Sequence, residues 1–508
     1  MATATASTIG KRKREDKTAP RSKKAREAQQ QQKNGTHPQV MENASLPDFD
    51  IRSTGAGVPP TTAPAAPAST LGDLVHVQIV TGSYERVLHG VSASIPRNLL
   101  RPQQASGQAD TSVTFSDTFL FAAHASSIRC LAISPPTEAD KRFLATGSSD
   151  ERINLYSVST APPRPNGKKS TPTVPAVAIS ENPRNKSLGS LIHHDRAITR
   201  LSFPSKAKLF SSAEDNTIAI SRTRDWTVLS SIKAPIPKPQ GRPSGDTAGP
   251  GEVPAGVNDF AIHPSQKLML SVGRGEKWLR LWNLMTGKKA GVLNFDRNLL
   301  AQVGESKFSS GEGRRVHWDA EGESYVVGFE RGAAVFGLDS KPRAVLKPSP
   351  PTKFHQMRML RANNVDLFAV STEDGRVCFY DLSDIRDVDA TKTLPQCPCR
   401  AQLGGPDANV KNRIKDFDIL TLPGAGLLVI TASSDGAIRL WTVADAAALS
   451  TKGDKPTQVG VLLGTLDTGN RITCLGAFAL DGTASADDLD DGDSTAGAEN
   501  EDDAEESD

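Results

Sequence analysis

The strongest constraint on the fold is a short unit that recurs along residues 74–480. Each copy combines two short β-type runs, a tight turn at an acidic residue and a third β-type run, with hardly any helical periodicity. Successive turns lie 44 to 65 residues apart, at Asp150, Asp215, Glu276, Glu330, Asp374 and Asp435. A propeller blade needs about 40–45 residues, so the excess must be loop. The repeat therefore predicts the blades of a β-propeller.

Six copies of the unit are recognisable, and the two ends of the segment supply a seventh. Clear copies have first strands at 128–133, 198–203 and 257–262, and fainter copies follow at 316–336, 367–380 and 428–441. Runs at 75–80, 87–91 and 115–121 read as the outer strands of one more blade, with 471–478 as its innermost strand. A blade built from both ends closes the ring and removes exposed sheet edges. We therefore predict an all-β, seven-bladed β-propeller over residues 71–480.

The polar residues of the unit resemble those of WD repeats. In that family a His before the first strand, a Ser or Thr on the second, the turn Asp and a third-strand Trp form a buried hydrogen-bonded chain. Because these residue types recur at matching places, we interpret them as structural rather than catalytic. The predicted blade network is His124, Ser148, Asp150, His194, Ser212, Asp215, Trp282, Asp374, Asp435 and Trp441.

The third copy carries a more specific resemblance. Ala261–Ser265, Leu270–Gly273 and the run Leu279–Lys288 (LRLWNLMTGK) resemble the WD-repeat family of the p21-activated-kinase-interacting protein, which includes the fungal maintenance-of-killer protein. Residues 124–134, 147–153, 194–203 and 316–325 agree with it, whereas glutamates replace the turn Asp at positions 276 and 330. The resemblance covers roughly residues 74–480.

This resemblance implies a WD-repeat scaffold that works in the nucleus and nucleolus. Its implied role is assembly of the large ribosomal subunit and maturation of pre-rRNA. The implied partners are proteins of pre-ribosomal particles, including ribosomal-protein-like assembly factors, with pre-rRNA as a further candidate. The alternative that it carries is a signalling adaptor that binds and inhibits a p21-activated protein kinase.

Both ends of the chain are predicted to be disordered. Residues 1–70 are poor in apolar side chains and hold two basic clusters typical of a bipartite nuclear-import signal, although an RNA-binding arm or a solubilising tail would look similar. The import candidates are Lys11, Arg12, Lys13, Arg14, Lys23, Lys24 and Arg26. Residues 481–508 carry thirteen acidic residues and no Lys or Arg, so they form an acidic tail.

The negative charge of the acidic tail offsets a large positive net charge on the rest of the chain. Residues 1–480 hold 60 Lys and Arg against 45 Asp and Glu, a net charge of +15. Such a charge favours polyanions such as RNA, although an uneven but merely solvated surface is the alternative. Loops that enter the innermost strands of a propeller commonly bind partners. The candidate partner-binding residues on those loops are Arg196, Lys411, Arg413 and Arg471.

Catalytic and metal-binding motifs are missing from the sequence, so we predict a monomeric binding protein that is not an enzyme and needs no cofactor. There is no nucleophile elbow, no His-Glu-x-x-His and no Gly-x-Gly-x-x-Gly. Cys397-Pro-Cys399 lacks a second ligand pair for zinc. Five scattered cysteines suggest a reducing compartment rather than a disulfide framework. No apolar run is long enough to span a bilayer, so no membrane is expected.

Overall fold

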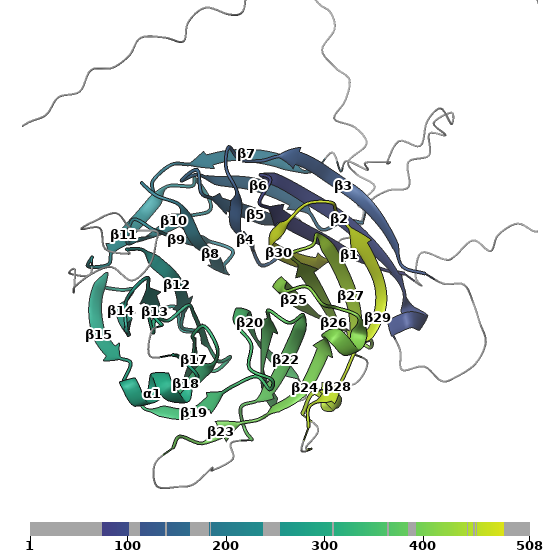
Figure 1. The fold of residues 1–508 in the computed structure, drawn as a ribbon. Coiled ribbons are helices and arrows are strands. Elements are labelled where there is room, and N and C mark those ends of the chain that lie inside the picture. The colour runs from purple at the N-terminus through teal and green to yellow at the C-terminus, as the bar shows by residue number, and fades with distance from the viewer. Residues whose placement is uncertain are drawn as a thin grey trace, which may run out of the picture. The chain divides into compact units, whose positions relative to one another are not determined.

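Seven β-sheets arranged as the blades of a ring make up the part of the chain that the structure describes (Figure 1). The computed structural model describes residues 74–100, 112–137, 140–162, 182, 184–236, 255–306, 309–362, 365–384, 393–443, 446–450, 453 and 455–481. The predicted basic arm, and the acidic tail after Asp481, lie outside these residues. The all-β, seven-bladed propeller is confirmed.

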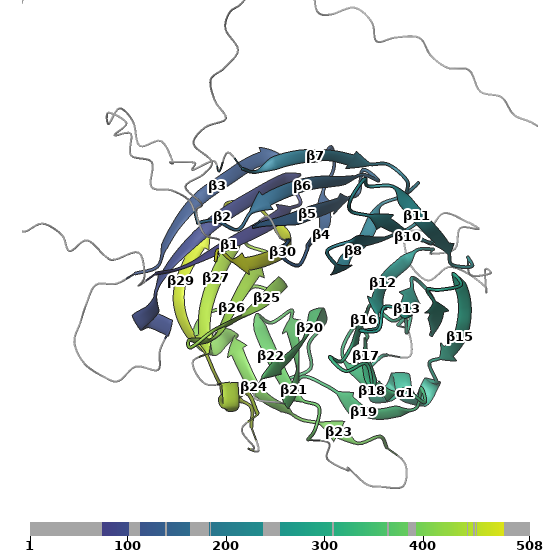
Figure 2. The ribbon, with the colours of Figure 1, turned by 180° about the vertical axis from the view of Figure 1, so that it is seen from behind.

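The first three blades in chain order have four antiparallel strands each. Figure 2 shows that their last strands lie at the outer edge of the ring. The first blade is β4 (Ile128–Ile133), β5 (Lys141–Ser148), β6 (Ile153–Ser159) and β7 (Lys186–Leu191). The second is β8 (Ile198–Ser205), β9 (Lys208–Ala213), β10 (Thr217–Arg222) and β11 (Val228–Lys233). The third is β12 (Val257–Ile262), β13 (Leu268–Gly273), β14 (Trp278–Asn283) and β15 (Lys288–Asn294).

The next two blades each gain a short fifth strand that runs parallel to the fourth. The fourth blade is β16 (Arg315–Trp318), β17 (Ser324–Gly328), β18 (Ala333–Gly337), β19 (Pro342–Leu346) and β23 (Gln396–Cys397). The fifth is β20 (Phe354–Ala362), β21 (Val365–Thr372), β22 (Arg376–Asp381), β24 (Cys399–Gly404) and β28 (Thr457–Gln458). The sixth blade returns to four strands: β25 (Ile414–Leu422), β26 (Gly426–Ser433), β27 (Ala437–Val443) and β29 (Val461–Asp467).

Strands from both ends of the described chain form the seventh blade. Its order is β3 (Thr114–Ala122), β2 (Val87–Pro96), β1 (Leu74–Ser83) and β30 (Ile472–Ala479). β30 runs antiparallel to β1, with Val77 opposite Ala479 and Thr81 opposite Leu475. The innermost strands contact one another in a closed circle, β30–β4–β8–β12–β16–β20–β25–β30. The late strand therefore supplies the contact between the sixth blade and the first.

The position of a strand within its blade explains its pattern of buried and exposed residues. The innermost strand β4 alternates buried and half-buried residues, because one face meets a neighbouring blade and the other is only partly covered. In the middle of a blade both faces are covered by neighbouring blades, so β22 is buried along its whole length. The outermost strand β7 is mostly exposed. The cores therefore lie between blades.

Helices are few among the described residues and lie outside the blades. α1 (Arg297–Gln302) follows β15 and packs Leu299 and Leu300 against the third and fourth blades (Figure 1). Three short 3-10 turns occur at η1 (Arg97–Leu100), η2 (Pro406–Ala408) and η3 (Ala446–Ser450). None of them interrupts the ring.

Candidate partner-binding face

A buried hydrogen-bonded network fixes the turn of the first blade. His124 precedes β4, and its Nδ1 lies 3.1 Å from Oδ2 of Asp150, the turn residue between β5 and β6. Its Nε2 lies 2.9 Å from the hydroxyl of Thr146 on β5. Burial lowers the pKa of His124 below its ordinary value although Asp150 raises it. A mainly neutral ring can donate to the aspartate and accept from the hydroxyl, which ties the turn to the loop that enters the blade.

The second blade repeats the arrangement. His194 Nδ1 lies 3.1 Å from Asp215 Oδ2, and Nε2 lies 2.8 Å from the Ser211 hydroxyl. Burial alone would raise the pKa of Asp215, but hydrogen bonds from His194 and Thr217 hold it well below its usual range. Asp215 also accepts the backbone N–H of Asp195 at 3.0 Å. Its carboxylate is fully used in holding the turn.

The structure corrects the predicted second-strand hydroxyls. Ser148 donates to the carbonyl of Ser126, and Ser212 bonds Thr199, so neither contacts the histidine. The residues that do, Thr146 and Ser211, occupy one equivalent register position. The first residue of the innermost strand pairs with Ser148 in the first blade and with Ala213 in the second. Thr146 and Ser211 each lie two residues before that paired residue.

The two buried tryptophans use the same register position in other blades. Trp282 Nε1 donates to Ser271 at 2.8 Å, and Trp441 Nε1 donates to Thr431 at 3.1 Å. At the turn of the fifth blade Asp374 accepts from Arg376 at 2.7 Å, and at the sixth Asp435 accepts from Asn412 at 2.8 Å. No blade of the described chain combines His, hydroxyl, Asp and Trp, so each closes its turn with a different subset.

The glutamates that replace the turn Asp also have partners. Glu276 is 2 % exposed and forms a two-point ion pair with Arg280, whose Nη2 lies 2.6 Å from Oε1. Glu330 lies 2.8 Å from Lys353 and 3.2 Å from Arg314. The glutamates at these turns therefore have cationic partners, as Asp374 does.

The candidate partner-binding residues lie where the chain enters innermost strands. Lys411, Arg413 and Arg471 precede β25 and β30, which are neighbours in the ring, while Arg196 precedes β8, two blades away from β30. Arg196, Lys411 and Arg471 are exposed, and Arg413 is half-buried with Glu373 at 3.8 Å. The structure therefore brings three of the four together and separates Arg196 from them.

Further cations that sequence reasoning missed extend this group. Burial, Arg413 and Arg471 lower the pKa of Lys415, so all three charges are close. Burial lowers the pKa of His355 to about 4, and Lys415, Arg413, Arg314 and Arg315 add to the effect. We call Arg314, Arg315, Arg413, Lys415 and Arg471 the basic mouth. The signal for them is a basic residue within one or two positions of the start of an innermost strand.

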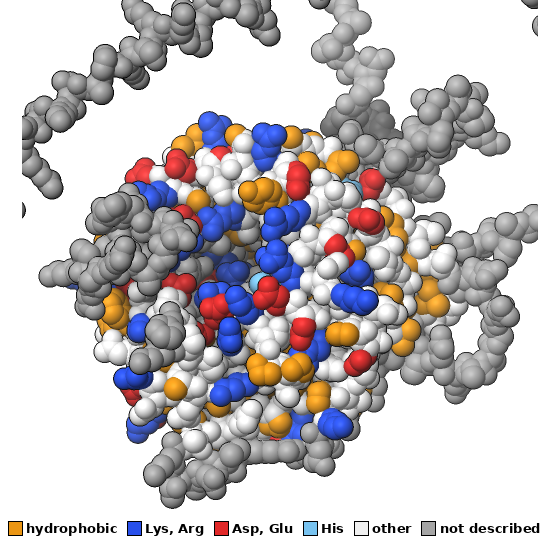
Figure 3. Space-filling model, viewed as in Figure 1, with side chains coloured by type: hydrophobic (Ala, Val, Ile, Leu, Met, Phe, Trp, Pro, Cys, Tyr) orange, Lys and Arg blue, Asp and Glu red, His pale blue; other side chains and the backbone are white. Residues whose placement is uncertain are grey.

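The basic mouth combines cations with an exposed aromatic ring. The Arg471 guanidinium lies 5.4 Å from the ring centroid of Tyr84, which is 59 % exposed. Figure 3 shows Lys and Arg side chains gathered around the centre of the ring. Arginines beside an exposed tyrosine suit phosphates, carboxylates and unpaired bases. This face can therefore bind a polyanion.

Comparison with known proteins agrees with this architecture. A family model described as "WD domain, G-beta repeat" matches residues 115–157. That segment runs from β3 through β4 and β5 into β6, which is one repeat of the ring. The chain is a WD-repeat propeller.

The WD-repeat propeller has homologues in animals and fungi. The "p21-activated protein kinase-interacting protein 1-like" of Danio rerio is 27 % identical over 80 % of this chain and 81 % of its own length. "Protein MAK11" of Saccharomyces cerevisiae is 28 % identical over 80 % of this chain and 84 % of its own length. "Shk1 kinase-binding protein 15" of Schizosaccharomyces pombe is 24 % identical over 80 % and 85 %. The similarity therefore extends well beyond the single matched repeat.

The remaining predictions for the WD-repeat propeller concern the cysteine pair, metal binding, membrane spans and the nuclear-import residues. Pro398 separates Cys397 in β23 from Cys399 in β24, so the two thiols belong to different blades. Within the described ranges no three His, Cys, Asp or Glu side chains are grouped to hold a metal. The helices described here are all too short or too polar to cross a membrane. The import candidates lie outside the described residues.

Proposed function

We propose that this protein is a non-enzymatic scaffold for assembly of the large ribosomal subunit and maturation of its pre-rRNA. The observation that carries the proposal is the relationship to MAK11 across 80 % of this chain. The resemblance to the maintenance-of-killer family implies that role. A net charge of +15 over residues 1–480 supports it, because pre-ribosomal particles are rich in phosphate.

The geometry supports binding rather than catalysis. In the first two blades His124 and His194 are buried, Asp150 and Asp215 are half-buried, and all four spend their hydrogen bonds on turns. The basic mouth instead presents half-buried and exposed cations at the starts of innermost strands and on the loops that enter them. A rigid ring loses little conformational entropy when its loops bind, which suits a protein that holds a client in place. The expected clients are proteins of the pre-ribosomal particle and pre-rRNA.

Depletion of the protein tests the role in assembly. Depletion should lower free large subunits and accumulate precursors of large-subunit RNAs, while small-subunit RNAs mature normally. Half-formed particles should follow, because initiation would outrun the supply of large subunits. Gradient sedimentation and RNA blots measure both effects. Unaltered subunit ratios would contradict the proposal.

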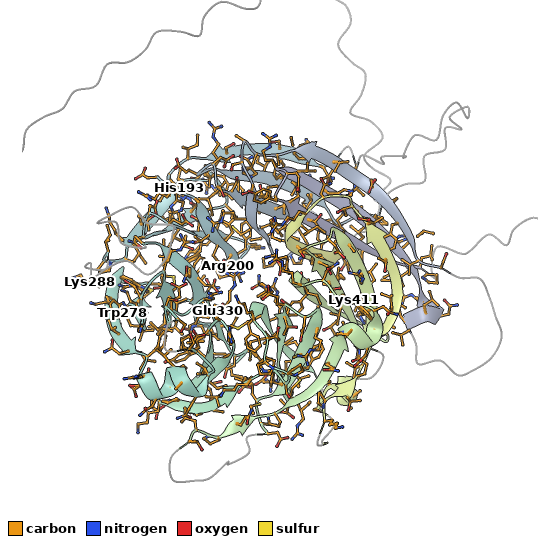
Figure 4. All side chains as sticks on the ribbon, in the orientation of Figure 1. His193, Arg200, Trp278, Lys288, Glu330 and Lys411 are labelled. Carbon is orange, nitrogen blue, oxygen red and sulfur yellow. The ribbon has the colours of Figure 1, made fainter. Side chains whose placement is uncertain are left out.

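Charge reversal tests the binding face. The triple variant Lys411→Glu, Arg413→Glu and Arg471→Glu should lose most of its co-sedimentation with large pre-ribosomal particles, because three cations of one face become anions. Its melting temperature should stay close to that of the wild type, since none of the three side chains is buried. The matched control Lys233→Glu, Lys288→Glu and Lys289→Glu reverses exposed charges on outermost strands (Figure 4 labels Lys288) and should still co-sediment.

The proposed location is the nucleus and nucleolus. Replacing Lys11–Arg14, Lys23, Lys24 and Arg26 with Ala should move a fluorescently tagged protein to the cytoplasm. The variant should keep its thermal stability, because these residues lie outside the propeller strands. Unchanged nuclear fluorescence would mean that import uses a partner or another segment.

The names of the relatives favour a second candidate, an adaptor that binds a p21-activated protein kinase. The family resemblance implies that such an adaptor inhibits the kinase. An adaptor should remain in light gradient fractions, and its depletion should raise kinase activity without changing subunit ratios. The depletion and sedimentation measurements above therefore distinguish the two functions.

A further inference from the structure

A polar cavity lies between the innermost strands of the ring. Its volume is about 250 Å³, and it is lined by residues of β4, β8, β20, β25 and β30 together with Arg142 at the start of β5. The charged side chains of its lining are Arg142, Arg200, Arg358 and Asp418. Figure 4 labels Arg200 at the inner edge of the ring. Three guanidinium groups therefore share one cavity with a single carboxylate.

Two of these arginines keep a donor without a partner. The Nε of Arg142 is buried and has no hydrogen-bond partner among the described residues, while Nη1 donates to the carbonyl of Ser134 at 3.0 Å. The Nε of Arg200 is also buried, and it lies 3.2 Å from Oδ1 of Asp259 without hydrogen-bonding geometry. Buried donors without an acceptor are costly, so Arg142 favours an added acceptor, whereas Arg200 already has the buried carboxylate of Asp259 as its ion-pair partner.

The third arginine, Arg358, has carboxylates as well as cations around it. Arg358 Nη2 donates to Asp416 at 3.1 Å, and its Nε lies 4.0 Å from Asp418. His317 lies near it, and burial together with Arg200, Arg358 and Arg315 lowers the pKa of His317 well below its ordinary value. Arg315 is therefore a fourth guanidinium close to Arg200 and Arg358.

We propose that this cavity binds a small phosphate-bearing anion through Arg142, Arg200 and Arg358. A guanidinium presents a planar fork of donors that matches two phosphate oxygens, and such charge-assisted bonds are stronger than neutral ones. The volume accommodates a diphosphate or a phosphorylated ring, whereas a duplex nucleic acid cannot enter it. Phosphate groups could come from inorganic polyphosphate or from phosphate esters of small metabolites. This site adjoins the basic mouth at Arg315, and it does not depend on the proposed function.

Calorimetric titration of the full-length protein tests the site with two probes, inorganic pyrophosphate and inositol hexakisphosphate. The double variant Arg142→Gln and Arg200→Gln should weaken binding at least tenfold, since each loses a charge-assisted hydrogen bond. Asp418→Asn should tighten binding several-fold, because it removes the carboxylate from the cavity while keeping its shape. The matched double variant Arg224→Gln and Arg297→Gln removes the same charge from exposed positions and should bind like the wild type.

The opposite responses of the variants separate binding from misfolding. If the Gln variants melt early, Arg142→Lys replaces them, because it keeps the charge but loses the fork and should still weaken binding. Binding of both probes would indicate inorganic phosphate groups as a source, and binding of inositol hexakisphosphate alone would indicate esters. The proposal would be overturned by no binding of either probe, by equal weakening in the control, or by weaker binding of Asp418→Asn. Binding of a short single-stranded RNA alone would also overturn it.

Discussion

Among single residues, two half-buried histidines make the fold sensitive to acid. Burial and the neighbouring His194 lower the pKa of His193 to about 4, and burial with nearby cations does the same for His355. In the unfolded chain a histidine titrates near 6.5. Between these values the unfolded chain binds more protons than the folded one, so the free energy of unfolding falls as the pH falls from about 6.5 to 4.

This difference predicts the effect of a histidine substitution. His193→Gln should reduce the proton uptake on unfolding at about pH 5 by up to about one proton, because one group with a lowered folded pKa is gone. Thermal melts from pH 8 to pH 4.5 should therefore show a flatter pH dependence for the variant. At pH 8, where both states of the wild type are neutral at this position, the slopes should agree. An equally steep loss in acid would contradict the assignment.

Residue identities were predictable from the sequence where the residue type alone defines the role. The His124–Asp150 and His194–Asp215 pairs form as the repeat suggests, because a turn Asp needs a donor on the entering loop. The hydroxyl partners were wrong, because Ser148 and Ser212 also lie near the turn and composition does not distinguish them from their neighbours. The distance from the turn identifies the correct hydroxyl, since Thr146, Ser211 and Thr431 each lie four residues before the turn Asp of their blade.

Among the elements, close approach between adjacent blades depends on a glycine. A Cβ at Gly147 on β5 would lie 2.6 Å from Cγ2 of Ile198, the first residue of β8, and 2.9 Å from the Cys130 sulfur. Gly82 on β1 has the same relation to Ile128, the first residue of β4. The small residue lets each innermost strand pack against the second strand of the preceding blade.

Gly147→Ala should therefore destabilise the protein, although alanine costs less conformational entropy in a strand than glycine does. Overpacking costs about 1–3 kcal/mol, which exceeds the roughly 0.5–1 kcal/mol gained by removing glycine from a strand. Chemical denaturation measures the difference. Gly291→Ala is the control, because a Cβ there would meet nothing closer than 3.9 Å, and it should be neutral or slightly stabilising. Equal effects at both positions would show that blade contact is not the cause.

Strand positions follow from periodicity, but the two short parallel strands do not. β23 and β28 have only two residues each and come from long connections far from the strands they extend. The sequence of such a dipeptide does not differ from that of an ordinary loop. Its pairing depends on where the preceding blade ends in space. Cys397-Pro-Cys399 illustrates the difficulty, since its two cysteines join different sheets.

At the level of the whole molecule, stability depends on closure by β30. Truncation after Asn470 should abolish the cooperative melt, because it removes Ile472, Leu475 and Phe478, each at most 2 % exposed, and leaves the edge of β1 unpaired. Burial of each such side chain contributes about 1.5–3 kcal/mol, and a domain has only about 5–15 kcal/mol in total. Truncation after Asp481 should be tolerated. A normal calorimetric transition for the shorter chain would contradict the shared blade.

The charge pattern of the complete ring was the least predictable feature. The net charge indicates a polyanion partner, but it assigns no residue to a face. The members of the basic mouth lie on β16, on β25 and in the loops that enter β16, β25 and β30, and the charged residues of the cavity come from β5, β8, β20 and β25. Only the order of blades around the ring brings such distant positions together, so their grouping needs the tertiary structure.

The shared blade also determines when the ring can close during synthesis. In the finished ring the Thr473 hydroxyl on β30 donates a hydrogen bond to the Gly82 carbonyl on β1. These two residues are 391 positions apart in the chain. At about 5–20 residues per second the ribosome needs roughly 20–80 s to make that stretch. Throughout this interval β1 presents an open edge to every other nascent chain nearby. Cellular yield therefore depends on elongation speed and chaperone supply as well as on the finished ring.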